Sequence, residues 1–302
     1  MTILDRAIVR ALPAVPRQVV RRLSSRYIAG TTLAEACEVV RELNAQGKEA
    51  TLDVLGEEVT LREEAIGLRD AYRRALDTIE EDGLRSNVSV KLTALGLKLD
   101  RGLCLADLTA VVEEAARFGN FVRIDMEDSS TTSETLALYR EIREGGHDNL
   151  GVVLQAALKR TLTDIGELAD LRPNVRVCKG IYVEPPEIAF REDETIRLNF
   201  LDALEALFDV GSYVGIATHD DWLIGEALGL VERKRLGRED YEFQMLLGVR
   251  PELGDELVRD GHRLRIYVPF GRRWYEYSIR RLQENPKIAG YVALDTLKRL
   301  RS

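Results

Sequence analysis

The sequence of 302 residues has few of the residues that define disulfide-bonded and metal-binding proteins. Its three cysteines, Cys37, Cys104 and Cys178, are odd in number and far apart. Neither a disulfide framework nor a CxxC metal site is therefore expected. Its three histidines include His219, and no further ligand stands at metal-binding spacing beside that residue. We therefore expect no metal.

Long apolar runs and an excess of basic residues are also missing. No run approaches the ~20 apolar residues that span a bilayer, and the first residues lack the apolar core and cleavage site of a signal peptide. The formal net charge is −8 and the pI is about 5.2, whereas a nucleic-acid-binding protein normally has a basic face. These features predict a cytoplasmic protein that binds no nucleic acid.

Eight short β-prone runs alternate with amphipathic helical stretches. The runs lie at 49–56, 87–96, 120–128, 149–157, 174–180, 212–219, 241–248 and 262–271. Such alternation predicts a parallel sheet buried on both faces, and eight units fit a closed (βα)8 TIM-like barrel of the α/β class better than an open sheet. Helical stretches at 4–28 and 32–46 come first. We expect one domain overall, with residues 1–48 as an N-terminal helical arm and 49–302 as the catalytic barrel.

The last unit, "VPFGRRWYEYSIRRLQEN" at 268–285, is unusual for an outer barrel helix because it is rich in arginine and aromatic residues. A helix turns about 100° per residue, so Arg280 and Arg281 point to different faces. Laid over a cleft, such a helix aims both arginines at one small anion, although a purely solvated helix could carry the same pattern. The stretch 291–302 could then take the outer position.

The candidate site consists of polar residues at the C-terminal ends of the predicted strands, where barrel enzymes carry their reactive groups. These residues are Glu57, Lys91, Asp125, Glu127, Asp128, Gln155, Arg176, Lys179, Thr218, His219, Gln244 and Tyr267. Structural roles stay open for several of them. Asp125 could cap a helix, and Lys91 could be a buried ion-pair partner. Gln155 and Gln244 could be buried amides that bond to neighbouring backbone.

No GxSxG elbow, P-loop or GxGxxG fingerprint is present. A site with cations, amides and carboxylates but no clear nucleophile suits a bound cofactor that does the difficult chemistry. A Schiff-base aldolase that uses Lys91 or Lys179 is the alternative enzyme. A barrel that only binds a small carboxylate, or that serves as an interaction scaffold, is the alternative without catalysis.

Eight motifs in a fixed order resemble the proline dehydrogenases. They are "NVSVKLTALG", "RIDMED", "VVLQAALKR", "RVCKGIYVEP", "IATHD", "YEFQMLLG" and "RIYVPFG" followed by "YSIRRLQEN". The chain is similar over roughly residues 50 to 286 to the single-function bacterial form and to the corresponding domain of the bifunctional proline-utilisation proteins. The resemblance implies a distorted barrel that holds FAD at its mouth, with the last barrel helix above that mouth.

The resemblance also implies the reaction. L-proline is oxidised to Δ1-pyrroline-5-carboxylate, the first step of proline degradation to glutamate. Hydride passes from proline C5 to FAD N5, and a membrane quinone then takes the electrons. This acceptor implies transient contact with the membrane surface, peripheral at the inner face of the cell membrane.

The residues that match the family's substrate site are Lys91, Asp125, Leu246, Tyr267, Tyr277, Arg280 and Arg281, with Glu57. The resemblance implies that Arg280, Arg281 and Lys91 bind the proline carboxylate. It implies that Asp125 lies beside the lysine, and that Tyr267, Tyr277 and Leu246 pack around the ring. It also implies that Glu57 pairs with Arg280 as a gate.

The residues that match the family's cofactor site are Gln155, Arg176, Lys179, Gly180, Thr218, His219, Gln244 and Glu284. The resemblance places Arg176 near the flavin N5 edge, Gln155 and Gln244 at the isoalloxazine edge, and Glu284 at the adenosine part. Ile181 stands where many relatives carry a small residue. A bulkier side chain there could reshape the choice between proline and hydroxyproline.

Overall fold

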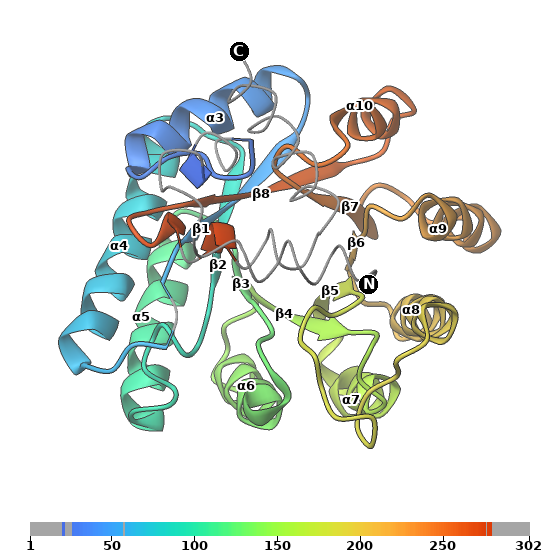
Figure 1. Ribbon diagram of the computed structural model, residues 1–302, viewed down its shortest axis with the longest axis horizontal. Coiled ribbons are helices and arrows are strands. Elements are labelled where there is room, and N and C mark those ends of the chain that lie inside the picture. Colours follow the sequence, from blue (N-terminus) through green and yellow to red (C-terminus); the bar gives the residue numbers. More distant parts are fainter. Residues whose placement is uncertain (1–19, 22–25, 57, 276, 280–302) are drawn as a thin grey trace, which may run out of the picture.

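Eight parallel strands form a closed barrel in the computed structural model, which describes residues 20–21, 26–56, 58–275 and 277–279. Each strand pairs with its neighbours in sequence, and β8 pairs with β1 to close the sheet (Figure 1). The strands are β1 Glu49–Val54, β2 Ser86–Val90, β3 Val122–Ile124, β4 Leu150–Gln155, β5 Asn174–Cys178, β6 Val214–Ala217, β7 Tyr241–Leu246 and β8 Leu264–Phe270. The predicted (βα)8 barrel is confirmed.

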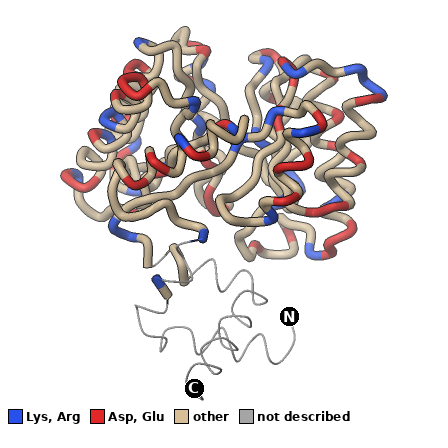
Figure 2. The backbone as a smooth tube through the Cα atoms, turned by 90° about the horizontal axis from the view of Figure 1, so that it is seen from above, with Lys and Arg blue, Asp and Glu red and all other residues tan. Residues whose placement is uncertain are grey.

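The helices surround the barrel as an outer ring (Figure 1). They are α3 Leu33–Ala45, α4 Arg62–Glu81, α5 Arg101–Arg117, α6 Ser129–Glu144, α7 Thr161–Leu168, the short 3-10 helix η2 Ala169–Leu171, α8 Asp193–Asp209, α9 Asp221–Lys234 and α10 Pro251–Arg259. Among the described residues, no helix is long and apolar enough to cross a membrane. Acidic and basic residues are interspersed along these helices and loops (Figure 2).

Aspartate side chains cap three of the helices that follow strands. Asp100 accepts from the Gly102 N–H at 2.7 Å, Asp128 from the Ser130 N–H at 2.9 Å, and Asp220 from the Trp222 N–H at 3.1 Å. These bonds satisfy backbone donors that the first helical turn leaves without partners. Asp128 is therefore the cap of α6. Asp125 does not cap this helix, and its side chain bonds to Arg176 of β5 instead.

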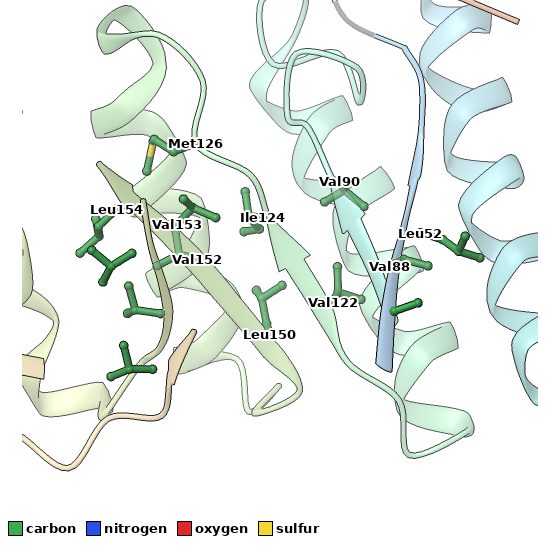
Figure 3. Close-up of a cluster of buried hydrophobic side chains, with 14 of the residues drawn as sticks. Leu52, Val88, Val90, Val122, Ile124, Met126, Leu150, Val152, Val153 and Leu154 are labelled. Atoms are coloured by element: carbon green, nitrogen blue, oxygen red, sulfur yellow. The ribbon is translucent and has the colours of Figure 1, made fainter. Parts of the chain in front are cut away.

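The strands alternate between an apolar face and a polar face. Leu52, Val88, Val90, Val122 and Ile124 belong to the buried layer between the strands and the helices (Figure 3). The residues between them point the other way, because side chains alternate along a strand. The barrel interior is consequently polar, and it is held by hydrogen bonds rather than by aliphatic layers.

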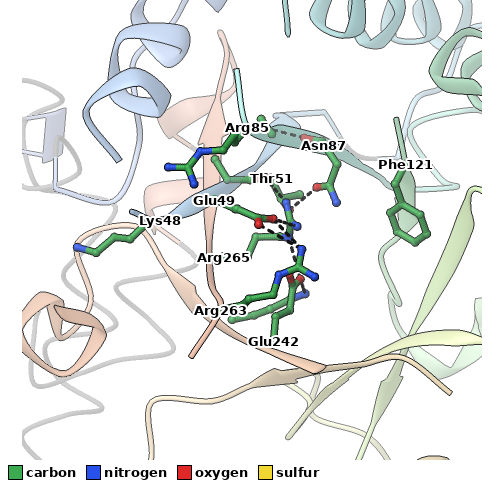
Figure 4. A network of polar contacts seen from close by, with 12 residues as sticks. Lys48, Glu49, Thr51, Arg85, Asn87, Phe121, Glu242, Arg263 and Arg265 are labelled. Atoms are coloured by element: carbon green, nitrogen blue, oxygen red, sulfur yellow. Dashed lines mark hydrogen bonds and ion pairs between the residues drawn. The ribbon is translucent and has the colours of Figure 1, made fainter. Parts of the chain in front are cut away.

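At the N-terminal end of the barrel, a charged network fills the interior (Figure 4). Arg265 Nε donates to Glu242 Oε1 at 2.7 Å, and its other arm pairs with Glu49. Arg263 also reaches Glu49, at 3.1 Å. Burial alone would raise the pKa of Glu242, but the Arg265 charge and its hydrogen bond hold that pKa below the usual value. The network closes the floor of the barrel opposite the mouth.

Helix α3 lies against β1 and β8, and its Ala36, Cys37, Val40 and Leu43 are buried in the main core. The Thr32 side chain and Glu35 form a capping box at its start. The division into residues 1–48 and 49–302 stays a prediction. Three predicted stretches lie outside the described residues. They are most of the helix at 4–28, residues 280–285 of the last unit, and the stretch 291–302.

Candidate active site

A cavity of about 850 Å³ opens at the C-terminal ends of the strands. Most of the predicted site residues that the structure describes line it: Lys91, Asp125, Gln155, Arg176, Lys179, Gly180, Thr218, His219, Gln244, Leu246, Tyr267 and Tyr277. Glu127 and Asp128 were also predicted, and they are not among its lining residues. Volumes of this size are typical of sites for small molecules and cofactors. Glu57, Arg280, Arg281 and Glu284 were also predicted, and they lie outside the described residues.

Asp125 is the centre of the cavity floor. Its Oδ1 accepts from Arg176 Nη1 at 2.6 Å and from Ser89 Oγ at 2.6 Å, while its Oδ2 accepts from Tyr267 OH at 2.6 Å. Residues from β2, β5 and β8 thus meet on one carboxylate that follows β3. This arrangement holds the Arg176 guanidinium and the Tyr267 phenol in fixed positions.

The protonation states of this centre follow from its contacts. Burial alone would raise the pKa of Asp125, but Arg176 and Lys91 together with the Ser89 and Tyr267 hydrogen bonds hold it below the usual value. Burial, with the charges of Asp125 and Asp53, raises the pKa of Tyr267 well above its usual value. Asp125 is therefore an ionised acceptor at neutral pH, and Tyr267 is a neutral donor.

Lys91 lies one residue past β2 and is 7% exposed. Its Nζ is 2.8 Å from Asp53 Oδ2, 3.7 Å from Asp125 Oδ2 and 3.2 Å from Tyr267 OH. Two carboxylates so close stabilise the ammonium form, whereas a Schiff-base lysine must be neutral to attack a carbonyl. Lys179 is paired with Asp220. These contacts disfavour the aldolase alternative.

Gln244 on β7 orients Arg176 on β5, with β6 lying between the two strands. Its Oε1 accepts from Arg176 Nε, and its Nε2 donates to Glu242 Oε1 at 2.6 Å. Gly215 on β6 makes room for this amide, since a Cβ at that position would lie 2.5 Å from Gln244 Nε2. Gln244 thus bonds to side chains. It connects Arg176 at the cavity to Glu242 of the charged network at the N-terminal end of the barrel.

Gln155 and Gly180 form the wall between β4 and β5. Gln155 Nε2 donates to the Glu127 carbonyl at 2.9 Å, which is the backbone pairing that a buried amide needs. Gly180 has a φ of +99°, and a Cβ there would lie 3.1 Å from Gln155 Oε1. Both the backbone conformation and the space require glycine at 180. Because Gly180 has no side chain, the cavity stays open beside the Gln155 amide.

The rim of the cavity carries Lys179, Arg197, Asp220 and Trp222. Asp220 accepts from Arg197 Nε at 2.8 Å and from Lys179 Nζ. Burial tends to raise the pKa of Asp220, but the bonds from Arg197 and Lys179 lower it to about 2. The Arg197 guanidinium lies 5.7 Å from the Trp222 ring centroid. Two cations and an aromatic face suit an anionic ligand with flat rings.

His219 bonds to the backbone at the end of β7. Its Nε2 accepts the Leu246 N–H at 2.9 Å, which assigns the ring proton to Nδ1 in the neutral form. Thr218 Oγ1 accepts the Asp220 N–H at 3.2 Å. Within the described ranges, no three His, Cys, Asp or Glu side chains are grouped to hold a metal ion. Ile181 lines the cavity and is 43% exposed.

The strand-end rule did not identify several residues at this site, namely Asp53, Ser89, Arg197, Asp220 and Trp222. Asp53 and Ser89 could have been found, because each interrupts an apolar strand at an inward position. Arg197 belongs to α8, and a rule based on strand ends contains no signal for it. Asp220 follows the "TH" pair directly and could have been included.

Comparison with known proteins identifies the family. A sequence model described as "Proline dehydrogenase" matches residues 36–293. "Proline dehydrogenase 1" of Bacillus subtilis (strain 168) is 38% identical over 274 residues, which cover 91% of this chain and 90% of that protein. "Proline dehydrogenase" of Deinococcus radiodurans is 33% identical over 286 residues, 93% of this chain and 92% of that protein.

A solved structure supports the fold. The crystal structure of proline utilization A (PutA) from Bdellovibrio bacteriovorus inactivated by N-propargylglycine matches with a TM-score of 0.84 and 23% identity. The match covers 92% of this chain and 36% of that longer chain. It shows the same barrel architecture. From the family match and the two bacterial relatives, we conclude that this chain belongs to the proline dehydrogenase family.

Proposed function

We propose that this protein oxidises L-proline to Δ1-pyrroline-5-carboxylate with FAD as its cofactor. The single observation that carries the proposal is the cavity, around which the described residues of the family's motifs gather although they are far apart in sequence. The reaction is the first step of proline degradation to glutamate. Membership of the family supports it.

The cavity fits FAD in two respects. Gly180 leaves open the space that a Cβ would fill beside Gln155. Lys179 and Arg197 supply positive charge at the rim, which suits a diphosphate. The residues that we expect to hold FAD are Gln155, Arg176, Lys179, Gly180, Thr218, His219 and Gln244, with Glu284 outside the described residues. When bound, FAD accepts the hydride that leaves proline C5, at its N5 position.

The floor of the cavity would bind the substrate. We expect Lys91, Arg280 and Arg281 to hold the proline carboxylate, because ammonium and guanidinium groups bind carboxylates strongly in a dry site. Tyr267 and Tyr277 line the same cavity as Lys91, and so does Leu246, which suits an apolar ring between them. The gate formed by Glu57 and Arg280 remains part of the proposal.

The fixed network has a chemical purpose in this reaction. Asp125 orients Arg176 and Tyr267 at 2.6 Å each, so these groups need no rearrangement when charge develops. The Arg176 cation would stabilise negative charge that arises beside it. The proline amine must be neutral to release a hydride from C5, so activity should fall at low pH.

The electron acceptor and the location complete the proposal. We expect a membrane quinone to take the electrons, with transient peripheral contact at the inner face of the cell membrane and an otherwise cytoplasmic protein. The resemblance to the family supports these expectations. Reduction of a soluble quinone analogue in the presence of L-proline, followed by sedimentation with vesicles, would test both.

The first test of the function is the visible absorbance spectrum of the purified protein. A flavin spectrum that bleaches when L-proline is added without oxygen is the expected result. A flavin spectrum that proline leaves unchanged would contradict proline as the substrate and direct attention to hydroxyproline. A colourless protein that FAD does not reconstitute would overturn the cofactor. Borohydride trapping of a substrate on Lys91 or Lys179 would then become the next measurement.

A further inference from the structure

Asp53 is a fully buried carboxylate that bonds to Lys91 of the active-site network from outside the cavity. It lies on β1 with 0% exposure, and it is not among the residues that line the cavity. Its Oδ2 accepts from Lys91 Nζ at 2.8 Å. Its Oδ1 accepts from Tyr72 OH at 3.2 Å, and Tyr72 is a fully buried residue of α4. One carboxylate therefore joins a barrel helix to the cavity lysine.

The distances assign Lys91 to Asp53 rather than to Asp125. Lys91 Nζ is 2.8 Å from Asp53 but 3.7 Å from Asp125, while Asp125 is 2.6 Å from Arg176. Each carboxylate thus has one close cation. Without Asp53, Lys91 would be drawn towards Asp125, which already accepts from Arg176, so two cations would compete for that carboxylate.

The contacts also fix the direction of the Lys91 ammonium group. One N–H points to Asp53, and another points to Tyr267 OH at 3.2 Å. Tyr267 OH in turn donates to Asp125 Oδ2. A continuous chain of donors and acceptors therefore runs from Tyr72 through Asp53, Lys91 and Tyr267 to Asp125. Two fixed N–H directions leave a lysine head group little freedom to rotate.

We propose that Asp53 is a positioning residue for substrate binding: held by Tyr72, it anchors the Lys91 ammonium beside Tyr267, where Lys91 meets the substrate carboxylate. The inference rests on the proposed function of the cavity. It extends that function because Asp53 acts on the substrate only through Lys91. The hydrogen bond from Tyr72 makes the anchor part of the barrel wall.

The test uses Asp53→Asn in the FAD-loaded protein, because asparagine keeps the shape but replaces one of the two acceptor oxygens, which bond to Lys91 and Tyr72, with an amide nitrogen that cannot accept. We expect the KM for L-proline to rise at least tenfold, while kcat falls less than threefold and the flavin spectrum is kept. Tyr72→Phe removes one hydrogen bond to Asp53 and should raise KM about two- to fourfold. Tyr72→Phe also serves as the test if Asp53→Asn does not fold. An unchanged KM in the variants that fold would overturn the proposal.

Two controls separate positioning from general damage. Asp164→Asn removes another buried carboxylate, which is paired with Arg160 at 2.9 Å outside the cavity, and should leave KM unchanged. The decisive comparison is Asp53→Asn in a Lys91→Met background, where the second change should have almost no further effect on KM. The same fold-change in both backgrounds would mean that Asp53 does not act through Lys91.

A last measurement keeps this inference separate from the proposed function. If proline does not bleach the flavin of the unaltered protein, the proposed function fails, whatever Asp53 does. The side-chain NMR signal of Lys91, assigned with Lys91→Met, then decides the anchor. We expect the signal to shift in Asp53→Asn at constant pH, and an unshifted signal would overturn the anchor.

Discussion

Tyr267 OH donates a hydrogen bond of 2.6 Å to Asp125 Oδ2 and thereby joins β8 to the end of β3. These residues are not on neighbouring strands of the barrel, so the bond crosses its interior. The Arg176 guanidinium lies 5.4 Å from the centroid of the Tyr267 ring and bonds to the same carboxylate. Tyr267 thus contacts both members of the Arg176–Asp125 ion pair, the carboxylate through its hydroxyl and the guanidinium through its ring.

Tyr267→Phe should impair catalysis by removing this donor. A hydrogen bond to a charged group contributes about 1.5–3 kcal/mol, so we expect kcat/KM for L-proline to fall roughly 10- to 150-fold. Steady-state kinetics with a quinone analogue would measure the change. Tyr241→Phe is the matched control, because Tyr241 OH bonds to His262 Nδ1 at 2.8 Å outside the cavity. Equal losses in both variants would contradict a specific role.

Arg176→Ala should slow flavin reduction more than it weakens proline binding. The guanidinium is the cation that we expect beside developing negative charge, and loss of one such group typically costs about 10²–10³ in rate. Rapid mixing with L-proline without oxygen would give the rate of bleaching. Arg176→Lys should restore part of it, since lysine keeps the charge but cannot reach both Asp125 and Gln244 in the same way. Unchanged bleaching in Arg176→Ala would count against the assignment.

The sequence predicted the part of the site that strands carry. Lys91, Arg176 and Tyr267 were found because parallel strands bring their C-terminal ends to one edge, so a polar residue at such an end has a predictable position. Asp53 was missed although it lies on β1. It interrupts the apolar run of β1 at an inward position, but a rule restricted to strand ends passes over it, and its contact with Lys91 of the neighbouring unit is visible only in the structure.

Helix-borne contacts at the rim were equally beyond a strand-based prediction. Arg197 reaches Asp220 from α8, and the angle of a helix against the barrel depends on packing that no periodicity specifies. Asp128 shows the opposite case. It looked like a site carboxylate, but the structure uses it as the cap of α6. In a barrel, each strand end is followed closely by the start of a helix. A carboxylate in the short segment between them can therefore be a site residue, as Asp125 is, or a helix cap, as Asp128 is.

Gly180→Ala should reduce FAD binding through two effects. A side chain at a φ of +99° strains the backbone by about 1 kcal/mol, and the new Cβ would press on Gln155. We expect the Kd for FAD to rise about tenfold, which corresponds to ~1.4 kcal/mol. Titration of the flavin-free protein with FAD would measure it. Gly146→Ala is the control. Gly146 has a φ of +93°, and an added Cβ there would meet no atom within 4 Å, so this variant has the backbone strain without the steric contact. A similar loss of FAD affinity in that control would exclude a local role for Gly180.

The rim carboxylate Asp220 links stability to pH. Its pKa in the folded protein is about 2, below the ~3.9 of an aspartate in an unfolded chain. The folded state therefore binds fewer protons than the unfolded state between these values. The stability that Asp220 contributes is complete above about pH 4 and is lost as pH falls towards 2.

Asp220→Asn should accordingly lower the free energy of unfolding at pH 7 and lose that effect near pH 2. We expect about 1 kcal/mol at neutral pH, a value reduced for solvent screening at the cavity rim. Asparagine is a good helix cap, so the start of α9 should persist and the loss should report the contacts with Lys179 and Arg197. Urea unfolding between pH 7 and pH 2.5 would give the difference. Asp221→Asn, an exposed neighbour paired with Arg250, should change stability little. A difference for Asp220→Asn that stays constant over the whole pH range would contradict the depressed pKa.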